Sequence, residues 1–406
     1  MGNTAINKQK IRSLKEFYSL MAQTRAVRFK LVDNILKDAK IPPDSIESLQ
    51  NALASLEDIP MEEGLKVLLI DGSEKTHVRL VYEIEELKKD IFYLENGEEE
   101  FIQYLEKLYP DFRTQVDKGI TELQNLQFNC FITDRDGTIN NYCGRYRSSV
   151  QSVYNSVFLT RFARNKTENP VIMTSAPLES TGIVDVSVNP EKTFIYAASK
   201  GREYLDLSGK RGVYPIEDNK QKLLNRLNEN LDNFLKQSAY EKFTMIGSGI
   251  QYKFGQTTVA RQDIRKSIPE DESENMLNKI REIVTEIDPE QKNFKIVDTG
   301  LDLEIILTIE SSDAKPKDFD KADAVKFLDT ALKLDLTKGP NLICGDTSSD
   351  IPMIEASMEK TENTWSVFVT KEERLAEKVR NVCAKSVIVH QPDILVTILG
   401  LLSKNS

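Results

Sequence analysis

The sequence predicts an α/β protein: a doubly wound parallel sheet, interrupted by an inserted α+β segment and preceded by a helical bundle. Three observations carry this prediction. Short apolar runs alternate with amphipathic segments after residue 126, a mixed segment separates two groups of these runs, and the earlier residues have helical periodicity. At 406 residues the chain is also longer than a usual single domain.

Residues 1–125 have the periodicity of helices. Apolar side chains recur between Leu14 and Ile35, "IPPDSIES" then breaks the chain and caps a second helix, and residues 78–109 form a third periodic segment. The run "VLLI" at 67–70 also fits a strand. These stripes predict an antiparallel bundle. Because it lacks a catalytic constellation, we interpret it as a packing or interaction module, open to a protein partner or to self-association.

The runs "FNCFITD", "NPVIMTS", "TFIYAAS" and "NLICGD" have the length and continuous apolarity of buried parallel strands. "SSVQSVYNSVFLTRFARN" supplies a crossover helix between the first two. We therefore predict a core in two parts, 126–216 and 316–406. In a doubly wound sheet the site is expected at the carboxyl ends of the strands.

The segment between these parts, residues 217–315, reads as a cap of mixed structure. "EKFTMIGSGIQYKFG" and "QTTVARQDI" have the pattern of strands, and "ESENMLNKIREIVTEI" has that of a helix. "NFKIVDTGLDLEIILTIE" predicts a hairpin. Inserted between two halves of a core, such a segment is expected to cover the site.

The composition excludes several classes of function. With 54 basic and 64 acidic residues the net charge is −10, which argues against general affinity for nucleic acid or an anionic membrane. The four cysteines form no CxxC pair, which is typical of free thiols in a reducing compartment. No run approaches the roughly 18 apolar residues of a membrane span. We expect a cytoplasmic protein.

Polar groups follow the predicted strands of the core. "DRDGT" places Asp134 and Asp136 after the first strand, and "VIMTS" ends in Thr174 and a second hydroxyl, that of Ser175. Lys321 opens a later helix, and the following strand ends in "GDTSSD". A pair of acids two positions apart is weak evidence alone, but the ordered set is a strong composite signal.

This set resembles the haloacid dehalogenase superfamily in its phosphatase branch, with a cap between the second and third motifs. The resemblance implies a haloacid dehalogenase-like core and hydrolysis of a phosphate ester. A receiver-type signalling domain also uses an aspartate phosphoacceptor, but it would lack the DGT signature, the late GDxxxD and the cap.

The chemistry of such a phosphatase explains the residue types. Asp134 attacks phosphorus to form an aspartyl-phosphate, and Asp136 protonates the leaving oxygen and then activates water. Asp134 and Asp346 offer hard oxygen ligands for Mg²⁺. Lys321 neutralises the nucleophile and the transferring group, and Thr174, which ends the apolar run first, donates to phosphate oxygens.

Further assignments rest on the resemblance. It implies that the backbone carbonyl of Asp136 is a third ligand of Mg²⁺ and that Asp350 supports the metal site. Asp350 also reads as the N-cap of a helix beginning "IPM". Lys321 is followed by Ala322, where many relatives carry glycine.

The details are similar to nematode-type trehalose-6-phosphate phosphatases, in the stretch from "DRDGT" to "FARN", in "VIMTSAPL", in "SKGREY" and in the helix-rich N-terminal third. The resemblance implies Mg²⁺ as cofactor and a sugar phosphate, trehalose 6-phosphate, as substrate. Positions matching the sugar-binding residues of the cap are Lys253, Arg261, Gln262 and Glu304.

Some residues depart from the pattern or fit it loosely. "SKGREY" resembles the "HGxE" turn of the family, with Gly201 and Glu203 aligned and Lys200 in place of histidine. "TSA" stands where fungal and plant members have "SGR". Arg145 and Arg147 fit phosphate contacts and solvated surface residues equally well.

Two other functions stay open. One is a phosphatase of another sugar or polyol phosphate, and the other is a scaffold whose helical module binds partners while the phosphatase fold is a relic. The intact acids of "DRDGT" and "GDTSSD" argue against a relic. Because no motif residue precedes Asp134, the sequence predicts that residues 1–125 are dispensable for the chemistry.

Overall fold

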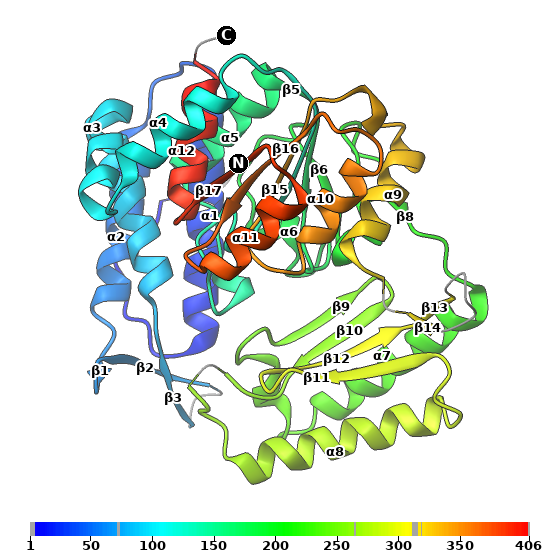
Figure 1. The fold of residues 1–406 in the computed structure, drawn as a ribbon. Coiled ribbons are helices and arrows are strands. Elements are labelled where there is room, and N and C mark those ends of the chain that lie inside the picture. The colour runs from blue at the N-terminus through cyan, green and yellow to red at the C-terminus, as the bar shows by residue number, and fades with distance from the viewer. Residues whose placement is uncertain (1–4, 71–73, 264, 311–315, 318, 405–406) are drawn as a thin grey trace.

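One large sheet lies between two sets of helices, and a smaller sheet forms a separate layer beside α8 (Figure 1). The N-terminal helices stand next to the C-terminal helix α12, so segments far apart in sequence share one side of the molecule (Figure 1). The structure is a computed structural model that describes residues 5–70, 74–263, 265–310, 316–317 and 319–404.

The large sheet has the strand order β17-β16-β15-β4-β5-β6-β7-β8. Neighbours from β17 to β6 are parallel, and β7 and β8 add an antiparallel edge. The order changes direction between β4 and β15, which makes this pair the switch point of a doubly wound sheet. The bounds are β4 Phe128–Asp134, β5 Thr167–Met173, β6 Ile195–Ala198, β7 Glu203–Leu205, β8 Arg211–Val213, β15 Asn341–Gly345, β16 Thr364–Val369 and β17 Ser386–Val389.

Both faces of this sheet are buried, which explains the continuous apolar runs of its strands. In β4, Phe131 belongs to one hydrophobic core, and its neighbours Cys130 and Ile132 belong to the other. Helices α5 and α12 pack on the first face, and α9, α10 and α11 pack on the second. The predicted fold class is confirmed. The helix bounds are α5 Val153–Lys166, α9 Lys321–Leu332, α10 Ile351–Met358, α11 Glu373–Val382 and α12 Pro392–Leu402.

The N-terminal helices form the predicted bundle and lie over α5 and α12. Gly97, with φ of 81°, interrupts α3, as its place in the sequence indicates. A small antiparallel sheet joins α2 to α3, so the alternative reading of "VLLI" as a strand is correct for most of that run. The bounds are α1 Leu14–Leu36, α2 Pro43–Glu57, β1 Met61–Glu62, β2 Leu65–Leu69, β3 Lys75–Val78, α3 Val81–Leu108 and α4 Phe112–Leu123.

The cap is an antiparallel sheet of order β11-β12-β10-β9 packed with α7 and α8 (Figure 1). The hairpin predicted in "NFKIVDTGLDLEIILTIE" is the β11–β12 pair. "EKFTMIG" is not a strand but a 3₁₀ turn and a loop, and the strand begins later. Residues 311–315, where the predicted cap ends, lie outside the described residues. The bounds are α7 Asp218–Leu235, β9 Ile250–Lys253, β10 Gln256–Ala260, α8 Glu270–Ile287, β11 Phe294–Asp298, β12 Asp302–Leu307, β13 Ile309–Glu310 and β14 Pro316–Lys317.

Two further features concern the thiols and the apolarity of the helices. All four cysteines are buried and carry free thiols. Within the described part of the chain, no helix combines the length and apolarity that crossing a membrane requires.

A buried network of charges ties the N-terminal helices to the core. Lys89 in α3 donates to Asp393 at 2.7 Å and to Glu86 at 2.9 Å, and all three side chains are buried. Tyr109 and Tyr154 also donate to Asp393. Burial by itself raises the pKa of Asp393, but the Lys89 ammonium and these donors hold it below its ordinary value.

A second buried pair joins α1, α3 and α5. Arg28 lies 2.6 Å from Asp90, with both side chains fully buried, and Asp90 accepts from the backbone N–H of Val153 at 2.6 Å. Removing residues 1–125 would therefore strip the apolar face of α5 and leave Asp393 without its cation. The bundle is part of the packed core, which is a finding that the sequence motifs did not indicate.

Replacing Lys89 with methionine tests this coupling. The change leaves the buried carboxylates of Asp393 and Glu86 without their ammonium, so we expect a loss of about 3–5 kcal/mol in the free energy of unfolding. Lys338→Met, which breaks an exposed pair with Glu168, is the matched control and should cost about 0–1 kcal/mol. Denaturant titration measures both, and equal small effects would contradict a shared buried network.

Candidate active site

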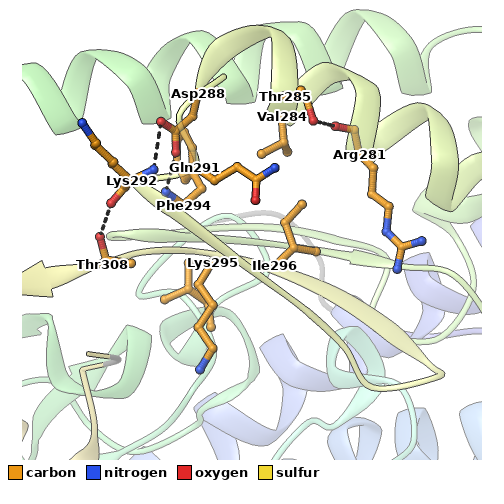
Figure 2. A pocket seen from close by; sticks show the side chains of 11 residues that line it. Arg281, Val284, Thr285, Asp288, Gln291, Lys292, Phe294, Lys295, Ile296 and Thr308 are labelled. Atoms are coloured by element: carbon orange, nitrogen blue, oxygen red, sulfur yellow. Dashed lines mark hydrogen bonds between the residues drawn. The ribbon is translucent and has the colours of Figure 1, made fainter. Parts of the chain in front are cut away.

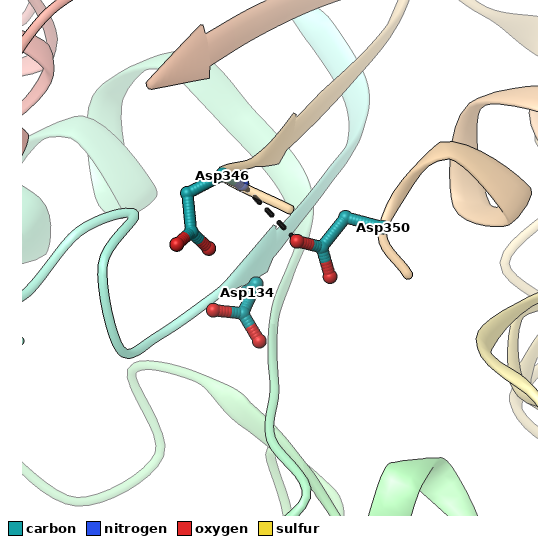
Figure 3. Close-up of side chains that lie close together, drawn as sticks. All are labelled: Asp134, Asp346 and Asp350. Carbon is teal, nitrogen blue, oxygen red and sulfur yellow. Dashed lines mark hydrogen bonds between the residues drawn. The ribbon is translucent and has the colours of Figure 1, made fainter. Parts of the chain in front are cut away.

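Three carboxylates from two distant parts of the sequence meet at the switch point of the sheet (Figure 3). Asp134 ends β4, Asp346 follows β15, and Asp350 precedes α10. One oxygen from each lies within 4.8 Å of the others. They meet because β4 and β15 are adjacent and parallel, so the carboxyl ends of the two strands lie side by side.

Lys321 is the cation of this cluster. Its ammonium lies 2.6 Å from Asp134 and also contacts Asp350. Asp320 caps the start of α9 by accepting from two backbone N–H groups, which fixes where the lysine enters. Burial lowers the pKa of Lys321, but Asp134 and Asp350 outweigh that effect and raise it above its ordinary value.

Asp350 occupies the N-cap position of α10, but its side chain makes no capping bond to that helix. It accepts instead from the backbone N–H groups of Asp346 at 3.1 Å and Thr347 at 2.9 Å. The carboxylate thus holds the loop that carries Asp346, and it holds Lys321 at the same time.

The cluster contains more negative than positive charge. Burial raises the pKa of Asp134 to about 8, with Asp350 and Asp346 adding to the effect and Lys321 opposing it. Burial and Asp350 also raise the pKa of Asp346, to about 7. A set of carboxylate oxygens with too little compensating charge has the donor chemistry that suits a hard divalent cation. The residues present therefore fit such an ion.

Two neighbours hold the acids in place, and sequence reasoning did not single out the second. Gly137 has φ of 92°, and a Cβ there would overlap the carboxylate of Asp346. Thr138 donates to Asp346 at 2.9 Å and to Asp134 at 3.3 Å. The "GT" of "DRDGT" is therefore steric room followed by a hydrogen-bond donor.

Asp136 lies outside the carboxylate cluster and faces the cap. Its side chain pairs with Arg135, which donates in turn to the hydroxyl of Ser149 at 3.1 Å. Burial raises the pKa of Asp136, with Arg135 opposing. A raised pKa suits a group that must hold a proton and then release it. Arg135 was not recognised from sequence, although its place between the two acids was the available signal.

A cavity of about 200 Å³ separates the core from the cap, and Asp136 and Ser175 line its core side. Thr174 does not line it. Its side chain is buried, and its hydroxyl oxygen accepts from the backbone N–H of Ala176 at 3.2 Å. Asp134 and Lys321 do not line this cavity either, so its lining leaves the choice between Thr174 and Ser175 open.

The cap side of this cavity contains three of the four predicted sugar contacts: Lys253, Gln262 and Glu304. Burial lowers the pKa of Lys253 to about 8, and Glu304 opposes this effect. Glu304 also lies 3.8 Å from Lys200 of the core. Its side chain therefore faces the core–cap junction.

Arg261, the fourth predicted contact, is not among the residues lining the cavity. Its guanidinium lies 2.5 Å from Asp298 and 2.6 Å from Glu274, within the cap. Its neighbour Gln262 lines the cavity, and both residues follow the end of β10 at Ala260. The geometry gives no support for substrate contact by Arg261.

The "SKGREY" turn fastens the core to the cap. Arg202 donates to the carbonyl oxygens of Gly255 at 2.6 Å and Leu307 at 3.1 Å, both in the cap. The backbone N–H of Lys200 donates to Thr174 at 2.8 Å, and Gly201 has φ of 86°. The turn thus links the end of β5 to the β9–β10 and β12 segments.

Another cavity, of about 630 Å³, lies within the cap between α8 and the β11–β12 pair (Figure 2). Arg281 from the helix and Lys295 from the strand border it (Figure 2). Its lining includes neither Asp136 nor any of the predicted sugar contacts. The core–cap cavity, which Asp136 and three predicted sugar contacts line, is therefore the candidate site.

Comparisons with known proteins agree with this arrangement. A family model described as trehalose-6-phosphate phosphatase, C-terminal, matches residues 131–395. A second, the trehalose-6-phosphate phosphatase N-terminal helical bundle domain, matches residues 13–112. The two matches divide the chain where the helical bundle meets the sheet domain.

Individual relatives include enzymes with two different names. A trehalose-phosphatase of Caenorhabditis elegans is 26% identical, over 94% of this chain and 94% of its own. An α,α-trehalose-phosphate synthase [UDP-forming] 2 of Aphelenchoides avenae is 32% identical over 96% of this chain, which spans 32% of that relative. The solved C-terminal domain of a C. albicans trehalose-6-phosphate phosphatase is 16% identical, covers 71% of this chain and 96% of its own, with a TM-score of 0.44. On the family models, the chain belongs to the trehalose-6-phosphate phosphatase family.

Proposed function

We propose that this protein hydrolyses trehalose 6-phosphate to trehalose and phosphate, with Mg²⁺ as its cofactor. The observation that carries the proposal is the cluster of Asp134, Asp346 and Asp350, in which Lys321 contacts Asp134 and Asp350, on the side of the core that faces the cap. Family membership supports the choice of substrate. Because the chain spans about a third of the synthase relatives, their activity is not carried over to it.

In the proposed reaction Asp134 attacks phosphorus. The new oxygen–phosphorus bond forms as the bond to the sugar oxygen breaks, and Asp136 gives its proton to that oxygen. Asp136 then takes a proton from water, whose oxygen attacks the aspartyl-phosphate and releases phosphate. Lys321 holds the attacking carboxylate in place and offsets its charge.

The carboxylates of Asp134 and Asp346 would hold Mg²⁺, with the backbone carbonyl of Asp136 as the third ligand from the protein. The bound ion would neutralise the phosphate and the nucleophile, so that two negative groups can approach. Asp350 orients Lys321 and the Asp346 loop. Thr174, which directly follows β5, or its neighbour Ser175, which lines the cavity, would contact the phosphate.

The cap is proposed to recognise the sugar through Lys253, Gln262 and Glu304. A phosphoryl group is the same in every substrate, so discrimination between alcohols must come from groups that reach the sugar hydroxyls.

We also propose the division into a bundle at 1–125, core segments at 126–216 and 316–406, and a cap at 217–315. The packing of α7 and α8 on the small sheet supports the cap as a unit.

The identity of the substrate is tested by phosphate release from a panel of sugar phosphates, including trehalose 6-phosphate, sucrose 6-phosphate and glucosylglycerol phosphate. The expected preference is for trehalose 6-phosphate.

The Asp134→Asn variant should release phosphate at the background rate while keeping its folded circular dichroism spectrum, because the shape remains and the attacking charge is lost. Turnover by this variant near the wild-type rate would contradict a covalent mechanism.

Binding of Mg²⁺ should stabilise the folded protein, because it supplies the charge that the cluster lacks. A ligand at 100 times its dissociation constant contributes about 2.7 kcal/mol. The thermal midpoint should therefore rise with Mg²⁺ and rise less with Ca²⁺, whose coordination is larger and looser. Asp346→Asn should abolish the rise, whereas Asp218→Asn, at the exposed start of α7, should keep it. An unchanged rise in Asp346→Asn would place the ion elsewhere.

Replacing Glu304 with alanine should sharply lower kcat/KM for trehalose 6-phosphate and spare p-nitrophenyl phosphate. A site that hydrogen-bonds the hydroxyls of a sugar loses transition-state binding when a partner such as Glu304 is removed. The aryl ester has no sugar hydroxyls, so its hydrolysis depends only on the core. Glu290→Ala, which changes an exposed cap glutamate, is the control. Equal losses on both esters would show a defect of the core, and no loss on either would exclude Glu304 from the sugar site.

A further inference from the structure

A further cavity, of about 690 Å³, adjoins the core–cap cavity, which is the proposed catalytic cavity, and is larger than it. Three parts of the fold build it: α3 with the residues just before and after it, the loop after β4, and two loops of the cap. Tyr142, Gly144, Gly247 and Asp263 line both cavities, so the two share a wall. We call the larger cavity the vestibule.

Each of these three parts contributes one arginine to the vestibule: Arg79 before α3, Arg145 in the core loop and Arg265 in the cap. Arg79 and Arg265 are exposed, and Arg145 is partly exposed. Arg145 donates to the backbone oxygen of Arg79 at 3.4 Å. Among the described residues, no carboxylate forms an ion pair with any of these three guanidinium groups.

The acids of the vestibule already have partners. Glu86 pairs with Lys89 at 2.9 Å, and Glu85 lies 3.3 Å from Lys88. Asp263 is buried and accepts from the hydroxyl of Ser267 and from nearby backbone N–H groups. These neutral donors leave Asp263 charged, so the vestibule lining has four basic and three acidic side chains, an excess of one positive charge.

This positive charge stands out against the rest of the protein. The whole chain carries −10, and the catalytic cavity is bordered by Asp136, Asp302 and Glu304. An anionic ester approaching such a surface is repelled until it meets local cations. Clefts lined by one sign of charge raise association rates by about 10–10³-fold.

The vestibule also has an apolar component. Val81, Leu108 and Tyr142 all line it, and they are large apolar side chains that the fold leaves exposed. Tyr142 is 67% exposed and stands where the two cavities adjoin. Its ring offers a flat surface with a polar tip, which suits the mixed apolar and hydroxyl faces of a sugar.

We propose that the vestibule is a capture site for the anionic sugar phosphate, from which the ester passes Tyr142 into the catalytic cavity. This inference rests on the proposed function and extends it, because it gives the N-terminal helical region a part in substrate binding through Arg79. The arginines act before the chemistry, so they affect kcat/KM and leave kcat unchanged.

The test compares the wild type with the double variant Arg79→Gln/Arg265→Gln. Both side chains are exposed, so neither change should disturb packing. At low ionic strength kcat/KM should fall on the order of 10-fold, with kcat unchanged. The wild-type kcat/KM should decline with added KCl, and the decline should be shallower in the variant, because screening acts only on charges that are present. A purely structural role would not change this salt slope.

Arg281→Gln is the matched control, since Arg281 borders the other cavity, within the cap (Figure 2). It should leave kcat/KM and its salt slope at wild-type values. If the double variant matched this control, or if it lost kcat instead of kcat/KM, the capture site would be overturned.

Each comparison is made with trehalose 6-phosphate and with p-nitrophenyl phosphate. Turnover of the aryl ester alone would contradict the proposed substrate, while its salt slope would still report on capture of a phosphate ester. Affinity for inorganic phosphate, measured by calorimetry on Asp134→Asn with and without the two arginine changes, gives the comparison without turnover. Equal phosphate affinities would overturn the capture site even if the proposed function held.

Discussion

The charge balance of the site depends on the contact between Lys321 and the carboxylates of Asp134 and Asp350. One ammonium faces a cluster of three acids, two of them buried and Asp346 partly exposed, so the site holds negative charge that it does not compensate. Burying like charges is costly, and proteins either protonate them or supply a cation. Without a cation, the raised pKa of Asp134 favours its protonated form. A bound divalent ion would instead keep the carboxylates charged.

The architecture delivers these acids from distant parts of the chain. The switch of strand order between β4 and β15 brings Asp134 and Asp346 to one edge of the sheet. The N-cap residue Asp320 fixes the start of α9, where Lys321 meets these acids. The bundle packs on α5 and α12 through Lys89 and Asp393. The catalytic cavity then lies between core and cap, and the vestibule brings in the bundle as a third wall.

What the sequence predicted well depended on burial on both faces and on ordered motifs. Runs such as "FNCFITD" could be read as strands because both faces of β4 are covered, which leaves no polar alternation. The acids after β4 and β15 could be placed together because parallel strands end at one edge. Side-chain direction was harder. Arg261 and Gln262 both follow the end of β10, and only Gln262 lines the core–cap cavity, a difference that the sequence pattern does not indicate.

The pairing of the bundle with the core could not be predicted for a different reason. Lys89 and Asp393 are far apart in sequence, and the apolar run after Asp393 does not indicate which cation pairs with it. Only the tertiary contact of Lys89 in α3 with Asp393 at the start of α12 makes them a buried pair. The expectation that residues 1–125 are dispensable followed from motifs alone, and motifs do not report such contacts.

The central claim is that a divalent cation completes the charge of the cluster at the β4–β15 edge. Anomalous diffraction from crystals soaked in Mn²⁺, an oxygen-preferring substitute for Mg²⁺, locates such an ion directly. The account predicts one strong peak within bonding distance of the carboxylates of Asp134 and Asp346, and its loss in Asp346→Asn. A peak elsewhere on the protein, or none at these carboxylates at millimolar Mn²⁺, would contradict it.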